Sequence, residues 1–187
     1  MDLGVRQGLH TTHSTASITF SLIFYGSSQF PLGDKTAVTV TYSKYFAEVG
    51  PGISISANRK NCQLTFGVAV PSGFSFGLAT ADYRGYYQLD SKVTGAQSSL
   101  YYFQGNLNQA TSRNTIVGPV DGGYYTYRSP FDLALTNLSP CGTNTVLNIG
   151  SDIRASNANN THGSGYIATD STDVSLTQTF HFQWQTC

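Results

Sequence analysis

Three cysteines have the clearest chemistry in this chain of 187 residues: Cys62, Cys141 and Cys187. Three thiols can form one internal disulfide, which leaves one sulfur free or open to an intermolecular bond. Antiparallel neighbours place the start of one strand beside the end of the other. Cys62, which begins an alternating segment, and Cys187 are therefore reasonable partners. Cys141, in a Pro-Cys-Gly turn, is the alternative, and spacing alone does not decide between them.

Metal binding and cysteine catalysis are not expected. The chain has no Cys-x-x-Cys pair, which zinc sites commonly use. A nucleophilic cysteine would also need a nearby base and a lowered pKa. The histidines are dispersed along the chain, at His10, His13, His162 and His181. We predict no metal site and no cofactor, and we interpret all three cysteines as structural.

Acidic residues offer a weak case for glycoside hydrolysis, which needs two carboxyl groups at a fixed separation. Asp90 and Asp170 each precede a serine in a turn-like sequence, and Asp82 can form a local contact with Arg84. Glu48 precedes a Gly-Pro-Gly bend. A serine hydrolase is disfavoured because no Gly-x-Ser-x-Gly elbow is present. We therefore predict no catalytic residues and lean against an enzyme, with a hydrolase acting on glycans as the less favoured function.

Tyrosine doublets are the best candidates for a binding surface. Neighbouring residues of a strand point to opposite faces of the sheet, so one ring of each doublet can be exposed. Exposed rings stack on the apolar faces of sugars, while polar side chains bind the hydroxyls. The competing interpretation is that both rings are packing residues. The six predicted binding residues are Tyr86, Tyr87, Tyr101, Tyr102, Tyr124 and Tyr125.

Composition argues against several partners. Charged residues make up 11% of the chain and cancel to zero, so nothing attracts phosphate backbones, and nucleic acid is not an expected partner. The longest apolar stretch, residues 18–25, is too short to span a bilayer. Polar, Gly-rich loops at 26–33 and 157–165 are candidate contacts for a host or partner protein. We expect a monomer.

Secretion is predicted from the cysteines and from two glycosylation acceptors, Asn137 and Asn159, each followed two residues later by Ser or Thr. Residues 1–14 contain neither the basic nor the apolar region of a secretion signal. We expect residues 1–16 to be disordered or mis-assigned, and residues 17–187 to form a single domain.

Alternating apolar residues indicate strands. Leu64, Phe66 and Val68 share one side, and the pattern resumes after Pro71-Ser72-Gly73, so residues 61–82 are predicted to form a hairpin. The same period appears in four further segments, 38–42, 131–135, 145–149 and 180–184. We predict an all-β antiparallel sandwich of about seven to ten strands, with a closed barrel as the alternative.

Nine ordered clusters give the chain a family resemblance. They are Gly50-Pro51-Gly52, Asn58 to Leu64, Pro71 to Phe74, Asp82 to Tyr86, Tyr101 to Phe103, Ser139 to Gly142, Leu147 to Ile149, Thr169 to Ser171, and Trp184 to Cys187. Over roughly residues 36–187 the chain resembles the secreted, mainly fungal family filed as domain of unknown function 4360. The resemblance implies a signal-bearing, disulfide-containing β protein with no established activity.

The chain departs from that family pattern at one cysteine. Similar members usually carry four cysteines, the first in a Gly-Cys-Pro segment before the strand that here spans Val38 to Tyr42. The run from Gly26 to Pro31 has no cysteine. A skipped or misplaced exon would explain both the lost cysteine and the missing leader, and natural divergence is the alternative.

Together these features predict a secreted, non-catalytic module that recognises a surface or a cell-wall polysaccharide. The alternative is a secreted, effector-like protein that binds a host or partner protein.

Overall fold

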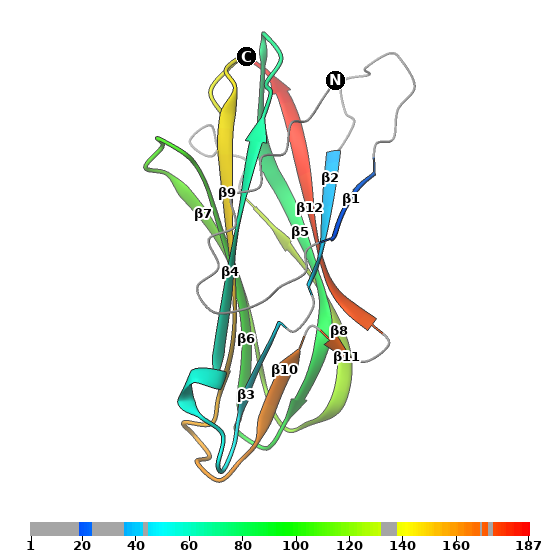
Figure 1. Cartoon of the computed structure of the whole chain (residues 1–187), viewed down its shortest axis with the longest axis vertical. Coiled ribbons are helices and arrows are strands. Elements are labelled where there is room, and N and C mark those ends of the chain that lie inside the picture. The colour runs from blue at the N-terminus through cyan, green and yellow to red at the C-terminus, as the bar shows by residue number, and fades with distance from the viewer. Residues whose placement is uncertain (1–18, 24–35, 43–44, 132–137, 169, 172–173) are drawn as a thin grey trace.

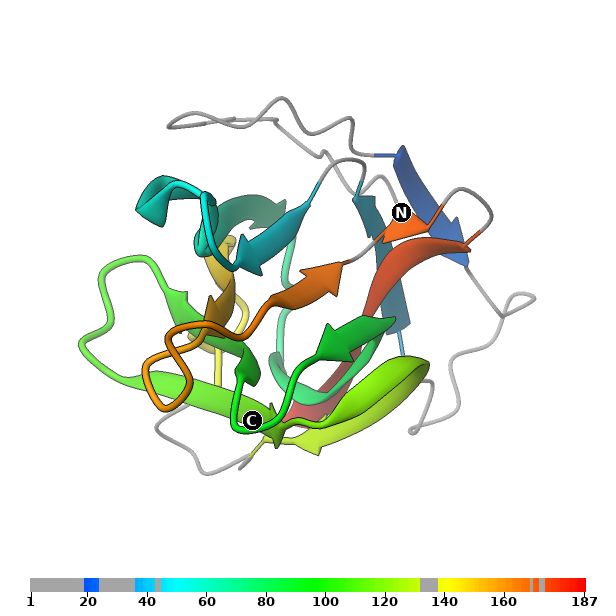
Figure 2. The same ribbon diagram turned by 90° about the horizontal axis from the view of Figure 1, so that it is seen from below.

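The computed structural model describes residues 19–23, 36–42, 45–131, 138–168, 170–171 and 174–187. Apart from the short 3-10 helix η1 (Ile55–Ala57), the regular elements in these ranges are strands. The strands form two antiparallel sheets that lie face to face (Figures 1 and 2). The predicted all-β sandwich is confirmed, and within the described ranges the two sheets remain separate rather than closing into a barrel.

The larger sheet has eight strands. β5 is central: β8 pairs with one of its edges, and β12 and β10 pair with successive parts of the other edge. β2 and then β1 lie outside β12, β3 lies outside β10, and β11 pairs with β12. The strands are β1 (Thr19–Ile23), β2 (Thr36–Tyr42), β3 (Phe46–Val49), β5 (Phe74–Leu89), β8 (Val120–Pro130), β10 (Gly165–Ala168), β11 (Asp170–Ser171) and β12 (Val174–Thr186).

The smaller sheet has four strands in the order β4, β9, β6, β7. Its edge strands come close to the larger sheet, since β3 lies beside β4 and β9, and β7 lies beside β8. The C-terminal residue lies at one tip of the sandwich, and η1 lies at the other tip (Figure 1). The strands are β4 (Arg59–Val68), β9 (Thr145–Ser156), β6 (Thr94–Phe103) and β7 (Gln109–Val117).

The predicted hairpin over residues 61–82 is wrong, although its two strands and its turn exist. Phe74 donates its backbone N–H to the carbonyl of Pro71 (3.1 Å), which closes the turn. β4, however, pairs with β9, and β5 pairs with β8, β10 and β12. The turn therefore carries the chain from one sheet to the other. A period of two shows which side chains share a face, but it does not show which strand is the neighbour.

The other predicted strands fall inside observed ones where they are described. Residues 38–42, 145–149 and 180–184 lie within β2, β9 and β12. Of residues 131–135 only Phe131 is described, and it is buried just after β8 ends. The described ranges contain twelve strands, more than the seven to ten predicted. Three of them are short, since β3 and β10 have four residues each and β11 has two.

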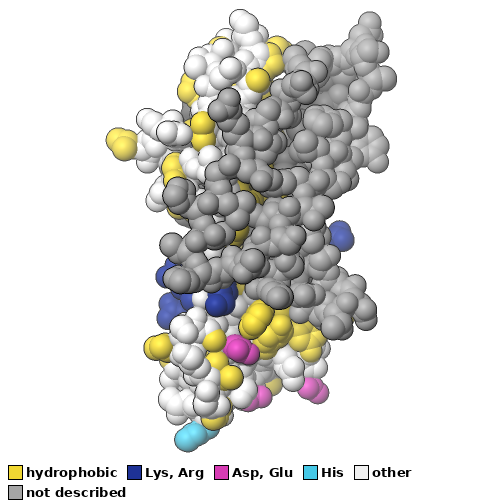
Figure 3. Space-filling model, in the orientation of Figure 1, with side chains coloured by type: hydrophobic (Ala, Val, Ile, Leu, Met, Phe, Trp, Pro, Cys, Tyr) yellow, Lys and Arg dark blue, Asp and Glu magenta, His cyan; other side chains and the backbone are white. Residues whose placement is uncertain are grey.

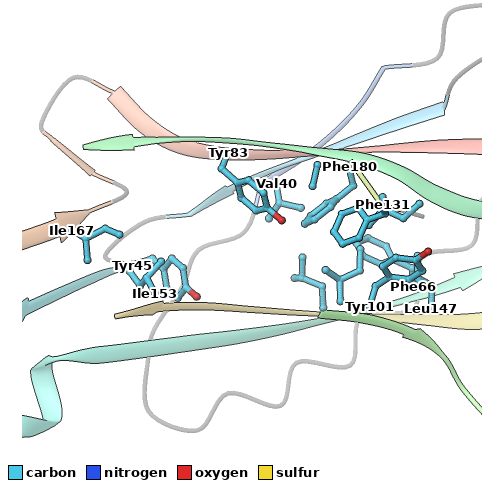
Figure 4. Close-up of a cluster of buried hydrophobic side chains, with 14 of the residues drawn as sticks. Val40, Tyr45, Phe66, Tyr83, Tyr101, Phe131, Leu147, Ile153, Ile167 and Phe180 are labelled. Atoms are coloured by element: carbon cyan, nitrogen blue, oxygen red, sulfur yellow. The ribbon is translucent and has the colours of Figure 1, made fainter. Parts of the chain in front are cut away.

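The core fills the space between the sheets (Figure 4). Tyr83 and Phe180 point inward from the larger sheet toward Tyr101 and Leu147 of the smaller one, and all four are at most 2% exposed. Inward residues alternate with outward ones along β6, as a half-buried sheet requires. Burial of these side chains is the main stabilising contribution in such a sandwich.

Polar side chains also join the two sheets inside the core. Gln178 of β12 accepts a hydrogen bond from Ser151 of β9 (2.8 Å), and Gln97 of β6 accepts one from Tyr125 of β8 (2.8 Å). Apolar contact has no directional preference, whereas a hydrogen bond fixes the positions of both partners. These bonds therefore fix how the sheets are placed on each other.

The disulfide joins Cys141 and Cys187, whose Cα atoms are 6.0 Å apart. Of the pairings that the sequence left open, the structure therefore forms the one between Cys141 and Cys187 and not the one between Cys62 and Cys187. Cys187 donates its N–H to the Gly73 carbonyl (3.0 Å), while Gly142 donates to Phe74 (2.8 Å), so one turn brings both cysteines together. Cys62 is a free thiol opposite Ser151, and burial raises its pKa.

Candidate functional site

Four aromatic side chains form a continuous row on the outer face of the larger sheet. Phe46 of β3 lies 5.7 Å from Tyr166 of β10 between ring centroids, Tyr166 lies 6.5 Å from Tyr86 of β5, and Tyr86 lies 5.5 Å from Tyr124 of β8. We call these four residues the aromatic row. It crosses four adjacent strands.

Strand alternation explains why these rings face outward. The residues that follow Phe46, Tyr166 and Tyr86 along their strands are Ala47, Ile167 and Tyr87, which are at most 2% exposed and belong to the core. Because successive side chains of a strand alternate between faces, the rings point to the opposite side.

Strand register then brings the rings together. Tyr86 is directly opposite Tyr124, and Ala168 is directly opposite both Tyr86 and Phe46. Gly122 leaves room for one ring, since a Cβ there would lie 2.5 Å from the Tyr86 hydroxyl. Gly122 also has a positive φ of 74°, a backbone conformation that favours glycine.

The aromatic row is partly open to solvent. The side chain of Tyr124 is 65% exposed, and Phe46, Tyr86 and Tyr166 are half-buried. Ala168, the small residue between Phe46 and Tyr86, has no exposed surface. Figure 3 shows hydrophobic side chains gathered over β3 and β10, in the lower half of the view. Partly exposed rings over a covered small residue make an apolar surface on which a ligand can rest.

Polar side chains flank the aromatic row on both sides. On one side, Arg84 and Thr126 face each other across β5 and β8, and both are exposed. On the other side, Glu48 and Gln88 lie opposite Tyr166 on β3 and β5. A ligand resting on the rings would thus meet hydrogen-bonding groups along both of its edges.

An ionic cluster lies further along the same face. Asp82 of β5 accepts two hydrogen bonds from Arg128 of β8, both 2.6 Å, and its carboxylate lies 3.2 Å from Nε2 of His181. The Arg128 hydrogen bonds, followed by that of His181, lower the pKa of Asp82 despite its partial burial. The predicted contact with Arg84 is replaced by this one because β8 places Arg128 directly opposite Asp82.

The Asp82→Asn variant is expected to be less stable than wild type at neutral pH, by a modest amount because Arg128 is largely exposed. A carboxyl group whose pKa is lowered by folding stabilises the protein above its unfolded pKa of about 3.9, and this contribution is lost as pH falls through the folded pKa. Thermal unfolding between about pH 7 and pH 3 should show the difference narrowing in acid. The stability difference between Arg128→Gln and wild type should also become smaller as the pH falls. A difference that stays the same in acid would contradict the assignment of this stabilisation to the Asp82 carboxylate.

The predicted tyrosine doublets divide between inside and outside, but they do not form one surface. Tyr86 and Tyr124 belong to the aromatic row. Tyr87 and Tyr125 point inward and stack with centroids 4.1 Å apart. Burial raises the pKa of Tyr87 to about 12 and raises that of Tyr125 as well, so both stay protonated at neutral pH.

The third doublet lies in the other sheet. Tyr101 is 1% exposed and packs against Phe103 and Phe131. Tyr102 points outward from the smaller sheet, on the opposite side of the sandwich from the aromatic row. Only two of the six predicted tyrosines therefore lie together on one outer face.

Phe46 and Tyr166 complete the aromatic row, and neither belongs to a tyrosine doublet. Phe46 follows the buried Tyr45, so Tyr45-Phe46 is itself an aromatic doublet that divides between the two faces. A doublet of two different aromatic residues thus carries the same sequence signal as a tyrosine doublet. Tyr166 is a single aromatic in a four-residue strand, and no local pattern marks it.

Glu48 and Asp82, two of the described acidic residues considered for hydrolysis, do not form the expected pair. Glu48 of β3 and Gln88 of β5 both lie opposite Tyr166 of β10, so they are at the same level of the sheet. Gln88 is six residues from Asp82 along β5, which places the carboxylates of Glu48 and Asp82 about 20 Å apart in the strand direction. Glycosidases hold theirs about 5 to 9.5 Å apart. Asp90 accepts the Ser164 N–H (2.7 Å), and the side chain of Asp170 lies outside the described residues.

The described residues contain no group of three or more His, Cys, Asp or Glu side chains arranged to hold a metal ion. Within the same ranges, no helix has the length and apolar character needed to cross a bilayer.

Of the two glycosylation acceptors, Asn137 lies outside the described residues, and Asn159 is exposed in the connection between β9 and β10. Its neighbours hold this loop in place. Asn157 donates to the Gly163 carbonyl (3.2 Å), and Asn160 donates to the Ser91 carbonyl (2.9 Å). Asn159 is thus presented to solvent from an ordered loop.

Comparison with known proteins gives one family. The model described as Domain of unknown function (DUF4360) matches residues 27–187. An uncharacterized secreted protein of Arthroderma benhamiae is 38% identical over 173 residues, which cover 88% of this chain and 70% of that protein.

A search of solved structures returns a weak likeness to TmCBM61 in complex with beta-1,4-galactotriose. It covers 81% of this chain and 71% of that one, with 10% identity and a TM-score of 0.26. The family match spans most of the sequence, and the chain therefore belongs to the family of the domain of unknown function DUF4360.

Proposed function

We propose that this protein acts outside the cell as a non-catalytic glycan-binding module and that the aromatic row is its binding surface. One observation carries the proposal: four rings on four adjacent strands share the outer face of one sheet. The secreted relative and the disulfide support the extracellular location.

A sugar ring matches this surface chemically. Its faces carry C–H groups that pack on aromatic rings, and its edges carry hydroxyls that need hydrogen-bond partners. The aromatic row offers the first kind of contact. Arg84 and Thr126 on one side, with Glu48 and Gln88 on the other, offer the second. Together they can bind a glycan without carrying out chemistry on it.

The proposal is tested by retention on insoluble β-glucan, chitin and cellulose. Wild type should be retained on at least one of them, and Tyr124→Ala should weaken binding about tenfold, or about 1.4 kcal/mol. Tyr124 is 65% exposed, so its removal should leave the fold intact.

Tyr102→Ala is the matched control, because it removes a tyrosine from the outer face of the other sheet. It should bind like wild type. Equal losses in both variants would show that the aromatic row is not the site. Failure of the wild-type protein to bind all three polymers and the soluble oligosaccharides prepared from them would remove the proposed function.

Binding of a partner protein is the second candidate function, favoured by exposed isoleucines in the connection between β3 and β4. Ile55 is 84% exposed and Ile53 is 42% exposed. Exposed apolar side chains of this kind are common in protein interfaces. Ile55→Ser should leave glycan retention unchanged, and loss of retention in this variant would move the binding surface to the β3–β4 connection.

We also propose that Asn159 carries an N-linked glycan. The acceptor triplet Asn159-Asn160-Thr161 and the exposure of Asn159 support it. Mass mapping of the secreted protein before and after enzymatic deglycosylation should show a glycan mass on the peptide that contains Asn159. Asn159→Gln should abolish that mass, and an unmodified Asn159 in protein secreted from a eukaryotic host would contradict the assignment.

A further inference from the structure

We infer that the aromatic row takes a single glycan chain lying across the strands, and not the flat face of a crystalline polysaccharide. This inference rests on the proposed function and specifies its ligand class. Three features of the outer face carry it: the planes of the rings, the twist of the sheet beneath them, and the polar groups on both sides.

The rings do not lie in one plane. Tyr86 is inclined by 67° to Tyr124 and by 61° to Tyr166, and Phe46 is inclined by 31° to Tyr166. A crystal face offers a plane of sugar rings, so it can stack fully only on rings that are parallel to one another. Two neighbouring rings inclined by more than 60° cannot both lie flat on such a face.

The direction of the row adds to this mismatch. The row runs across β3, β10, β5 and β8, and adjacent strands of a sheet are rotated by about 20 to 25° relative to each other. Over three steps between strands the support therefore turns by roughly 60 to 75°. A free glycan chain can rotate about its linkages and follow that turn, whereas a chain locked in a crystal cannot.

The polar flanks fit the edges of a single chain. Arg84 and Thr126 stand on one side of the row, and Gln88 stands on the other. An isolated chain exposes hydroxyls along both edges, within reach of such side chains. In a crystal the edges of each chain are occupied by neighbouring chains, so these flanking groups would have no partners to bind.

The ligand class is tested by calorimetry with soluble oligosaccharides of increasing length, prepared from β-1,3-glucan, β-1,4-glucan and chitin. For one of these series the affinity should rise with length until the chain covers the row and then level off. Tyr124→Ala, at one end of the row, should lower the affinity about tenfold, or about 1.4 kcal/mol, and should shift the plateau to a shorter oligosaccharide. Tyr102→Ala should match wild type.

Retention on microcrystalline cellulose and crystalline chitin separates the outcomes. The inference is overturned if wild type is retained on a crystalline polymer, Tyr124→Ala is not, and soluble oligosaccharides fail to compete. That result would leave the proposed function in place. If neither soluble nor crystalline glycans bind, both the proposed function and this inference fail.

Discussion

The Phe76→Ala variant is expected to lose about 3 to 5 kcal/mol of unfolding free energy. Phe76 is 2% exposed, and its ring contacts three others. Its centroid lies 5.3 Å from Phe103, 5.9 Å from Phe182 and 5.0 Å from Trp184. Phe103 belongs to the opposite sheet, so removal of the Phe76 ring opens a cavity at the contact between the layers. The lost free energy of unfolding then includes both the transfer free energy of the buried ring and the cost of the cavity that it leaves behind.

Urea denaturation at neutral pH measures this loss, and two variants calibrate it. Trp184→Ala should cost less, because Trp184 is only partly buried where it packs on Phe76. Tyr124→Ala should change stability by less than about 0.5 kcal/mol, as expected for an exposed surface position. A loss below about 1 kcal/mol for Phe76→Ala would show that Phe76 is not part of a packed core.

Removal of the disulfide is expected to have a comparable effect. Replacing both Cys141 and Cys187 by serine should lower stability by about 4 kcal/mol, because the bond closes a loop with a sequence separation of 46 residues and restricts the unfolded chain. The double replacement is preferred, since a single one would leave a free thiol able to pair with Cys62.

Denaturation of oxidised wild type beside the double variant measures the effect, and non-reducing peptide mapping checks the pairing. A cross-linked peptide that contains Cys141 and Cys187 is expected. Cys62→Ser should cost far less, because Cys62 forms no bond. A bridge that includes Cys62, or equal stability of wild type and the double variant, would contradict the pairing.

The fold class, and the face of the sheet to which each side chain points, could be predicted from the sequence. Alternation in Phe180, Phe182 and Trp184 correctly indicated which side chains of β12 point inward. The same rule explains why Tyr87 is buried while Tyr86 lies in the aromatic row. These features depend on a residue and its nearest neighbours along the chain, and a local pattern therefore contains them.

Strand pairing could not be predicted in the same way. Cys62 lies opposite Ser151, and β5 lies beside β12, so the partners are far away in the sequence. A hairpin of β4 and β5, which are neighbours in the sequence, would show the same alternation of apolar side chains. Packing of the whole core decides which strands pair. The aromatic row and the Cys141–Cys187 bond depend on these distant pairings. For that reason the sequence indicated only two of the four residues of the row and left the disulfide partners open.

The place of β12 in the larger sheet has a consequence for biosynthesis. The ribosome makes β12 after every other described strand, yet β12 lies between β2 and β5 and pairs with both. Until β12 emerges, the facing edges of β2 and β5 expose backbone groups that can pair with other chains. The larger sheet is therefore completed only once β12 has been made, and until then the open edges of β2 and β5 are sites of possible self-association.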